Sequence, residues 1–316
     1  MNTDTKKKRA LNLWQGATMS GEFRKKLESG EKIVFDGAMG TELAARGVEP
    51  GTAANLTASE TVLAVHRACR EAGAEVLITN TFDVNRQLLA DRGVRTKLES
   101  ECHAACEIAR EAAAGGGFIA GDMGPTGALL EPHGTTPMSE MQVVFLETAM
   151  LLAKCGVDLF IVETMSDDHE MMLAVRACRA VAERARRDIP IAASMAFDPS
   201  RQGGFRTNMG VSPAEAARAM VEAGADIIGA NCGSVTPEQM AEIVREFRRA
   251  TDKPILIQPN AGVPELQAGR TVFRLAPEEF ADGMKRVLDA GARLVGGCCG
   301  TTPEHIRCLR QAAERK

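Results

Sequence analysis

The chain has 316 residues, 45% hydrophobic and 25% charged, and its 38 basic and 42 acidic residues give a formal net charge of −4. This ordinary composition is sufficient for one large domain or two modest ones with a sizeable core. The small charge gives no electrostatic argument for a nucleic-acid partner or an anionic membrane, and no apolar run approaches the roughly 18 residues of a membrane span. Because no apolar stretch follows the basic N-terminus, it does not resemble a secretory signal, and we expect a soluble, cytoplasmic protein.

The first 30 residues lie outside the pattern that organises the rest of the chain. We predict a helix from about Ala10 to Ser29, which carries the single Trp of the sequence, Trp14. This N-terminal extension, residues 1–30, is expected to pack on the bottom or a flank of a main domain formed by residues 31–316.

Four later segments share a helix-like stretch, then a glycine, then a short apolar run rich in β-formers. The glycines are Gly73, Gly156, Gly224 and Gly291, and they are 83, 68 and 67 residues apart. Half of the shorter spacing is about 34 residues, a suitable length for one strand–helix unit, so further strands are expected midway. The eight predicted strands are 32–38, 76–82, 117–123, 159–165, 191–198, 227–233, 255–262 and 294–300.

These strands are continuous apolar runs, as expected for parallel strands that are buried on both faces. Helix starts between them are marked by Ser212, Thr236 and Thr302, each followed by proline. Eight strand–helix units in about 270 residues predict an α/β fold, a (β/α)8 TIM barrel. A doubly wound open sheet is the alternative, but no G-x-G-x-x-G follows the first strand.

Catalytic groups of such barrels lie at the C-terminal ends of the strands. In this sequence those ends carry Asp36, Asn80, Thr81, Asp122, Glu163, Asp198, Asn231, Cys232, Asn260, Cys298 and Cys299. The absence of Lys and Arg from this set argues against a phosphorylated substrate. The five histidines fall on predicted helices or loops, so a histidine general base is not favoured either.

Three of the nine cysteines point to a metal centre. Cys232 ends the sixth predicted strand, while Cys298 and Cys299 end the eighth, so a closed barrel brings all three to one rim. Neighbouring residues of a regular strand point to opposite faces, so the chain must leave the pleat at Cys298 and Cys299, which the flanking glycines permit. Three thiolates around an open position form a catalytic type of zinc site, with Zn–S distances of about 2.3 Å.

The other six cysteines lie in predicted helices or at a helix end. Cys102 and Cys106 are four residues apart, a spacing that would allow both to bind one metal ion. We favour their interpretation as part of a packed helix face, because free cysteine is commonly buried.

Several motifs together resemble the zinc-dependent homocysteine S-methyltransferases, from Lys32 to Arg310. They are FDGAMGTEL, ITNTF, GDMGPTG, VETM, GANCG, QPNAG and GGCCGTTPEHI. NTFDVNR and GTTPEHI are most similar to the homocysteine-binding domain of cobalamin-dependent methionine synthase. The chain contains no tyrosine, and betaine-dependent members rely on tyrosines, which argues against betaine as donor.

The resemblance implies that Cys232, Cys298 and Cys299 are both the metal ligands and the catalytic centre. Zn²⁺ would hold homocysteine as a thiolate, which accepts a methyl group and leaves as methionine. Asn260 is expected to occupy the fourth position on zinc when substrate is absent.

The resemblance also implies a set of residues that bind the amino-acid part of homocysteine. Asp36 and Glu163 suit its ammonium group. The backbone N–H groups of Gly37 and Ala38, with Thr81, suit its carboxylate. Asn231, beside the first zinc ligand, and Asn260 complete the predicted substrate-binding group.

Cobalamin-dependent synthases also carry a second barrel for methylfolate and a corrinoid module. A second barrel needs about 200–250 residues, for which this chain leaves no room, and no D-x-H-x-x-G corrinoid signature occurs. We therefore expect methylcobalamin to be supplied by a separate corrinoid protein. The alternatives are a small sulfonium donor such as S-methylmethionine, another small thiol as acceptor, or a thiol-binding subunit that is inactive without its partner. A barrel lyase or aldolase is disfavoured, because the rim lacks a lysine and a carboxylate–histidine metal site.

Overall fold

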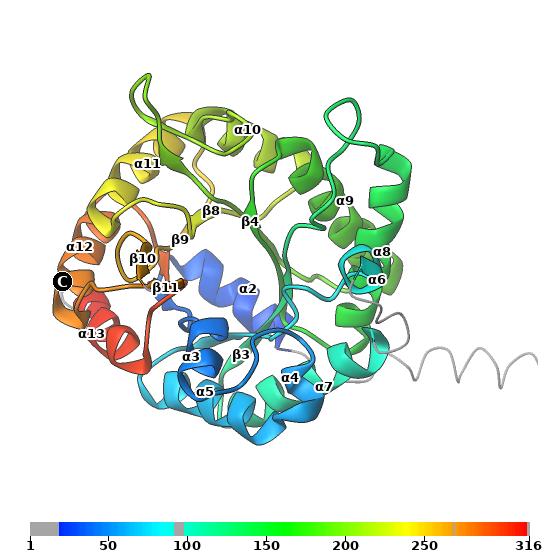
Figure 1. Ribbon diagram of the computed structural model, residues 1–316, viewed down its shortest axis with the longest axis horizontal. Helices are drawn as coiled ribbons and strands as arrows, with labels where there is room; N and C mark the ends of the chain where they lie inside the picture. Colours follow the sequence, from blue (N-terminus) through cyan, green and yellow to red (C-terminus); the bar gives the residue numbers. More distant parts are fainter. Residues whose placement is uncertain (1–18, 92–97, 268, 315–316) are drawn as a thin grey trace, which may run out of the picture.

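The computed structural model describes residues 19–91, 98–267 and 269–314. Within them, eight parallel strands form one sheet that curves into a barrel, with helices around its outside (Figure 1). The barrel strands are β1 (Ile33–Val34), β2 (Val76–Ile78), β3 (Phe118–Met123), β4 (Leu159–Met165), β5 (Ile191–Met195), β8 (Ile227–Asn231), β9 (Ile255–Gln258) and β12 (Leu294–Val295). Each lies within one of the eight predicted runs.

The order of strands in the sheet closes the barrel. Neighbours run β1-β12-β9-β8-β5-β4-β3-β2, and the first and last strands meet at a parallel bridge between Phe35 and Val76. The N–H of Asp36 also donates a hydrogen bond of 3.0 Å to the carbonyl of Val76. The predicted (β/α)8 TIM barrel is therefore confirmed.

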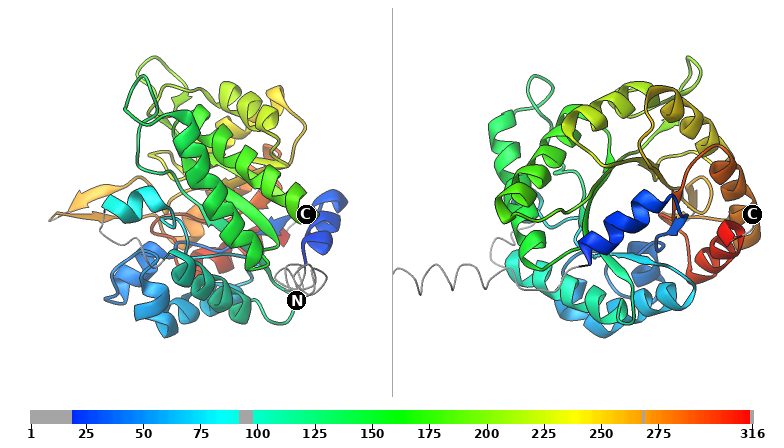
Figure 2. Two further views of the ribbon diagram at one scale, coloured as in Figure 1. Left: turned by 90° about the vertical axis from the view of Figure 1, so that its right-hand side faces the viewer. Right: turned by 180° about the vertical axis from the view of Figure 1, so that it is seen from behind.

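Two short hairpins extend the loops beyond the barrel strands. One pairs β6 (Asp198–Pro199) with β7 (Phe205–Arg206), and the other pairs β10 (Glu265–Gln267) with β11 (Arg270–Val272). In the side view, the second hairpin projects well away from the barrel (Figure 2, left).

Helices surround the strands, and the three helices with predicted start signals begin at Pro213, Pro237 and Pro303, directly after those signals. The helices are α2 (Ser20–Ser29), α3 (Gly40–Ala45), α4 (Ala54–Thr57), α5 (Ser59–Glu71), α6 (Arg86–Asp91), α7 (Leu98–Ala112), α8 (Met138–Lys154), α9 (Asp168–Ala185), α10 (Pro213–Ala223), α11 (Pro237–Ala250), α12 (Pro277–Asp289) and α13 (Pro303–Glu314). Ser212 caps α10 and Thr236 caps α11, each in a reciprocal capping box. No helix in the described ranges is long and apolar enough to cross a bilayer.

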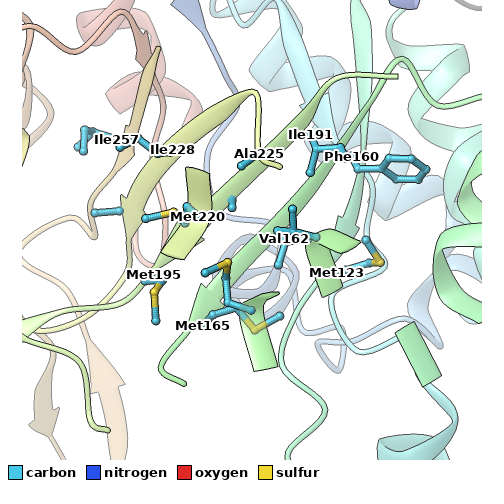
Figure 3. Packing of buried hydrophobic residues seen from close by; sticks show 14 of the residues in the cluster. Met123, Phe160, Val162, Met165, Ile191, Met195, Met220, Ala225, Ile228 and Ile257 are labelled. Carbon is cyan, nitrogen blue, oxygen red and sulfur yellow. The ribbon is translucent and has the colours of Figure 1, made fainter. Parts of the chain in front are cut away.

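The main core fills the layer between the strands and the surrounding helices. Outward-facing strand residues such as Met123, Val162 and Met195 are buried there (Figure 3). Inward-facing residues of the same strands form a second cluster inside the barrel. Both faces of the strands are thus buried, which explains why their sequences do not alternate between apolar and polar residues.

Helix α2 covers the N-terminal end of the barrel, where it crosses the opening (Figure 2, right). Its buried Phe23 and Leu27 pack on the cluster inside the barrel, and the rings of Phe23 and Phe118 meet edge to face at 5.3 Å. Most of the predicted helix before α2, including Trp14, lies outside the described residues. The domain boundary at residue 30 stays a prediction.

Polar contacts hold α2 at the start of four strands that belong to the sequence repeat. In each repeat, the residue directly before the strand contacts either α2 or Met19, the residue that precedes α2. The pairs are Glu75 with Lys26, Asp158 with the N–H of Met19, Asp226 with Arg24, and Arg293 with the carbonyl of Leu27. The repeat therefore also supplies the ring of side chains that closes the bottom of the barrel.

Candidate active site

A cavity of about 380 Å³ opens at the C-terminal ends of the barrel strands. The residues that line it include three with carboxyl groups, Asp83, Asp122 and Glu163, and three with thiols, Cys232, Cys298 and Cys299. Among the described residues that line it, there is no lysine or arginine. The cavity therefore combines metal-binding sulfur with acidic groups and has no basic side chain to offset them.

The three cysteines meet because both of their loops are bound to the end of β9, which lies between β8 and β12 in the sheet. The N–H of Cys232 donates to the carbonyl of Gln258, and that of Cys298 donates to the carbonyl of Pro259. The carbonyl of Cys299 accepts from Ala261. As a result, the three sulfurs lie within 4.8 Å of one another. Tetrahedral zinc ligation at about 2.3 Å requires sulfurs about 3.8 Å apart, a separation that lies within this limit.

The backbone leaves the pleated form at both cysteine loops. Strand β12 ends at Val295, so Cys298 and Cys299 lie beyond it, as the sequence predicted. Gly300 has φ of 78°, and a Cβ atom there would lie 2.3 Å from Phe273. Cys232 itself has φ of 56°, a left-handed conformation that a side chain other than glycine rarely adopts. Such local strain is typical of functional sites.

The sulfur cluster favours one thiolate even before a metal is considered. Hydrogen bonds from the thiols of Cys298 and Cys299 lower the pKa of Cys232. The hydrogen bond to Cys232 raises the pKa of Cys298 and of Cys299 in turn. A thiophilic cation would favour the thiolate form of all three.

The side chain of Asn260 forms a hydrogen bond with Cys232, so it lies beside the sulfur cluster. It is 2% exposed, and its Nδ2 donates to the carbonyl of Gly233 at 2.8 Å. Its Oδ1 is buried and has no hydrogen-bond partner among the described residues. Three sulfurs and one unpartnered amide oxygen therefore fit the needs of a four-coordinate zinc ion.

Asn231 holds Glu163 in the cavity wall. The register of β4 against β5 shifts between Val162 and Met165, and Thr164 within this bulge has φ of 58°. The Nδ2 of Asn231 donates to Glu163 Oε2 at 2.6 Å. Its Oδ1 accepts from the N–H of Thr164 at 2.9 Å and from Ser194 Oγ at 2.6 Å. The bulge and this buried amide together set the direction of the carboxylate.

Three buried carboxyl groups have a raised pKa, namely Glu163 and Asp122 in the cavity wall and Asp36, which is not among the residues that line the cavity. Burial raises the pKa of Glu163 to about 7, and the negative charge of Cys232 adds to the effect. Burial also raises the pKa of Asp36 and of Asp122. One oxygen of each aspartate is buried without a hydrogen-bond partner among the described residues. A positively charged ligand would stabilise the ionised forms, so the site favours cations.

The predicted carboxylate-binding groups lie close to the cavity but are already engaged. Gly37 and Ala38 line it, and the N–H of Ala38 donates to Thr301 Oγ1 at 3.1 Å. Thr81 is fully buried behind the wall, where its hydroxyl donates to the carbonyl of Asp122 at 2.8 Å. The assignment of these groups stays a prediction.

Two residues near the site were not expected from the sequence. Gln258 lines the cavity at the end of β9, and its Oε1 is buried without a partner among the described residues. The sequence feature that could have identified Gln258 is a polar residue at the end of the apolar run Ile-Leu-Ile. The Nδ1 of His66, a buried residue of α5, lies 3.8 Å from Asp36 Oδ2. Helical periodicity gave no indication that His66 would reach a strand end.

Comparisons with known proteins indicate the family. The family model described as homocysteine S-methyltransferase matches residues 33–313. Over 291 residues the chain is 33% identical to methionine synthase of Mycobacterium tuberculosis, which covers 87% of this chain and 24% of that protein. Over 314 residues it is 30% identical to betaine–homocysteine S-methyltransferase 1 of Bos taurus, and the alignment covers 90% of this chain and 73% of that protein.

A solved structure supports the fold. The metallated form of the homocysteine methyltransferase MmuM from Escherichia coli matches with a TM-score of 0.72 and 24% identity, over 91% of this chain and 98% of that one. The chain spans about a quarter of the length of the methionine synthases that it matches.

Proposed function

Because the chain belongs to the homocysteine S-methyltransferase family, we propose that it transfers a methyl group to the sulfur of homocysteine and forms methionine. The observation that carries this proposal is the set of three sulfurs, within 4.8 Å of one another, in the wall of an otherwise acidic cavity. This combination suits a substrate that brings a thiol and an ammonium group.

The residues that would hold zinc are Cys232, Cys298 and Cys299. When bound, the ion would keep the substrate thiol in its deprotonated, nucleophilic form at neutral pH. This role removes the need for a general base, which is consistent with a cavity that no described histidine lines. Asn260 would satisfy the fourth position when substrate is absent.

The remaining residues would bind and orient the amino acid. Glu163 and Asp36 would pair with its ammonium group, which would draw both carboxyls into their ionised forms. Asn231 would keep Glu163 pointed at the ligand through the hydrogen bond described above. The N–H of Ala38 would bind the substrate carboxylate only if it released Thr301.

For the methyl donor, we propose a methylcorrinoid carried by a separate protein. The support is the resemblance of NTFDVNR and GTTPEHI to the homocysteine-binding domain of cobalamin-dependent methionine synthases, together with the match to proteins named methionine synthase. A sulfonium donor such as S-methylmethionine, a different small thiol, or a subunit that is inactive alone are the competing possibilities. We further propose that the protein acts in the cytoplasm.

The thiol-activation step is tested by zinc content and X-ray absorption on one sample. For the zinc bound by the rim cysteines, we expect three Zn–S ligands, rising to four when homocysteine is added. Cys299→Ser should lose the equivalent of zinc bound at the rim while circular dichroism stays unchanged, because the barrel core does not depend on the rim. Cys308→Ser is the matched control, since this partly exposed thiol on α13 belongs to no sulfur cluster among the described residues. Unchanged zinc in variants of all three rim cysteines would refute the mechanism.

The donor is tested in parallel reactions of zinc-loaded protein with homocysteine. The donors are free methylcobalamin, S-methylmethionine and betaine, and methionine is measured. Turnover with methylcobalamin would support a corrinoid donor. A preference for S-methylmethionine would instead identify a sulfonium compound as the donor. Failure with all three, together with a normal fourth sulfur ligand, would indicate a subunit that needs its partner.

A further inference from the structure

A second group of three cysteines lies outside the cavity. Cys102 and Cys106 are one turn apart on α7, and Cys155 is the C-cap residue that directly follows α8. Their sulfurs all lie within 4.8 Å of one another, the same limit that the rim cysteines satisfy. We propose that Cys102, Cys106 and Cys155 form a second metal site, which binds one thiophilic ion such as Zn²⁺ or Cu⁺.

This group is separate from the proposed active site. Cys155 precedes β4, so it lies near the N-terminal end of the barrel, whereas the rim cysteines follow the C-terminal ends of β8 and β12. Helices α7 and α8 belong to the outer layer (Figure 1). An ion bound there could not reach a substrate in the cavity, so we assign it a structural role, namely to link α7 to α8.

The burial of the three side chains suits a closed site with one accessible side. Cys102 and Cys106 are 0% and 2% exposed, while Cys155 is partly exposed. Thiolates are the ligands that soft ions prefer, and two of the three would be shielded from competing water. The positive charge of Lys154, which acts on Cys155, would offset part of the negative charge of the thiolates.

Simple packing would not require all three sulfurs to converge. A buried cysteine can behave as a small apolar side chain, and Cys69 and Cys178 are examples outside any sulfur cluster among the described residues. A disulfide would use two of the three sulfurs and leave the third unpaired. One metal ion is the ligand that uses all three together, because each thiolate supplies one bond.

The sequence analysis singled out two of the three cysteines of this site. The spacing of Cys102 and Cys106 allows two ligands on one helix face, but the third ligand comes from a residue 49 positions after Cys106. The prediction that both side chains are buried on a helix face is confirmed, and the proposed site adds a function to that face.

The test uses the full chain, loaded separately with Zn²⁺ and with Cu⁺ under reducing conditions. A Cys232→Ser, Cys298→Ser, Cys299→Ser variant removes the rim site and should retain one equivalent of at least one of the two ions. Adding Cys155→Ser should abolish that binding, and adding Cys308→Ser should not. If the triple variant does not fold, the metal content of Cys155→Ser is compared with that of the wild type. Cys155→Ser should bind one equivalent of metal less, while homocysteine still adds a sulfur ligand to the zinc at the rim.

Several results would overturn the proposal. They are the absence of both ions from the folded triple variant, full retention of metal after Cys155→Ser, and formation of a disulfide within the group when it is purified in air with no metal bound. Selective retention of Zn²⁺ or of Cu⁺ would support the site and identify its ion. Because the readout is metal stoichiometry at α7 and α8, loss of methyl transfer would not affect the outcome.

Discussion

Removal of the Asn231 side chain tests whether this buried amide organises the cavity. In Asn231→Ala, the N–H of Thr164, the hydroxyl of Ser194 and the carboxyl of Glu163 each lose a partner. A buried group left without its hydrogen bond costs about 1–3 kcal/mol, and partial relaxation makes the sum smaller than three full penalties. We expect a loss of about 3–6 kcal/mol in the free energy of unfolding, a large share of the roughly 5–15 kcal/mol typical of a protein.

The assay is urea unfolding followed by circular dichroism, with the KM for homocysteine measured in zinc-loaded protein. Ser194→Ala is the matched control, because it removes one of these hydrogen bonds and leaves Glu163 in place. It should cost about 1 kcal/mol and leave KM unchanged. The reasoning is refuted if Asn231→Ala is no less stable than Ser194→Ala, or if its KM equals that of the wild type.

Three further changes test the substrate site and the bottom of the barrel. Glu163→Gln should raise KM for homocysteine about 10- to 150-fold and leave the zinc content unchanged, because a hydrogen bond to a charged group contributes about 1.5–3 kcal/mol. An unaltered KM would show that Glu163 does not bind the ammonium group. Phe23→Ala should lower the free energy of unfolding by about 3–5 kcal/mol in urea, because the ring is fully buried; a loss below about 1 kcal/mol would mean that α2 does not plug the barrel. Burial would raise the pKa of Asp226, but hydrogen bonds from Arg24 and Arg179 outweigh it and hold that pKa below its usual value. The carboxylate is then stabilising above about pH 4, and the stability gap between wild type and Asp226→Asn should shrink as the pH falls further; a gap independent of pH would contradict the pairing.

The barrel and the position of its three rim cysteines could be predicted because both depend on local and periodic features. Each apolar run ends at the C-terminal end of a barrel strand, so the repeat alone predicts that Cys232 and Cys298 lie at strand ends. Glycines after Val295 indicated that the chain leaves the strand there. The structure adds the reason that both loops meet, which is their shared hydrogen bonding to the end of β9.

The substrate site was less predictable, because its geometry depends on contacts between residues distant in sequence. Thr81 follows a strand as expected, yet its hydroxyl is used by the carbonyl of Asp122. Gln258 and His66 reach the site or its supporting layer from positions that periodicity assigns to the core. Whether a polar side chain faces a ligand or another part of the protein is decided by its neighbours in space.

The sequence by itself determined the α/β barrel, the positions of its strands and the sulfur-rich rim, because strand and helix periods and repeat length are local properties. Tertiary structure alone decided that α2 closes the bottom of the barrel, that Asn231 holds Glu163, and that Cys155 joins Cys102 and Cys106. Each of these contacts joins elements that are far apart in the chain, and the packing of those elements around a common core brings the side chains together.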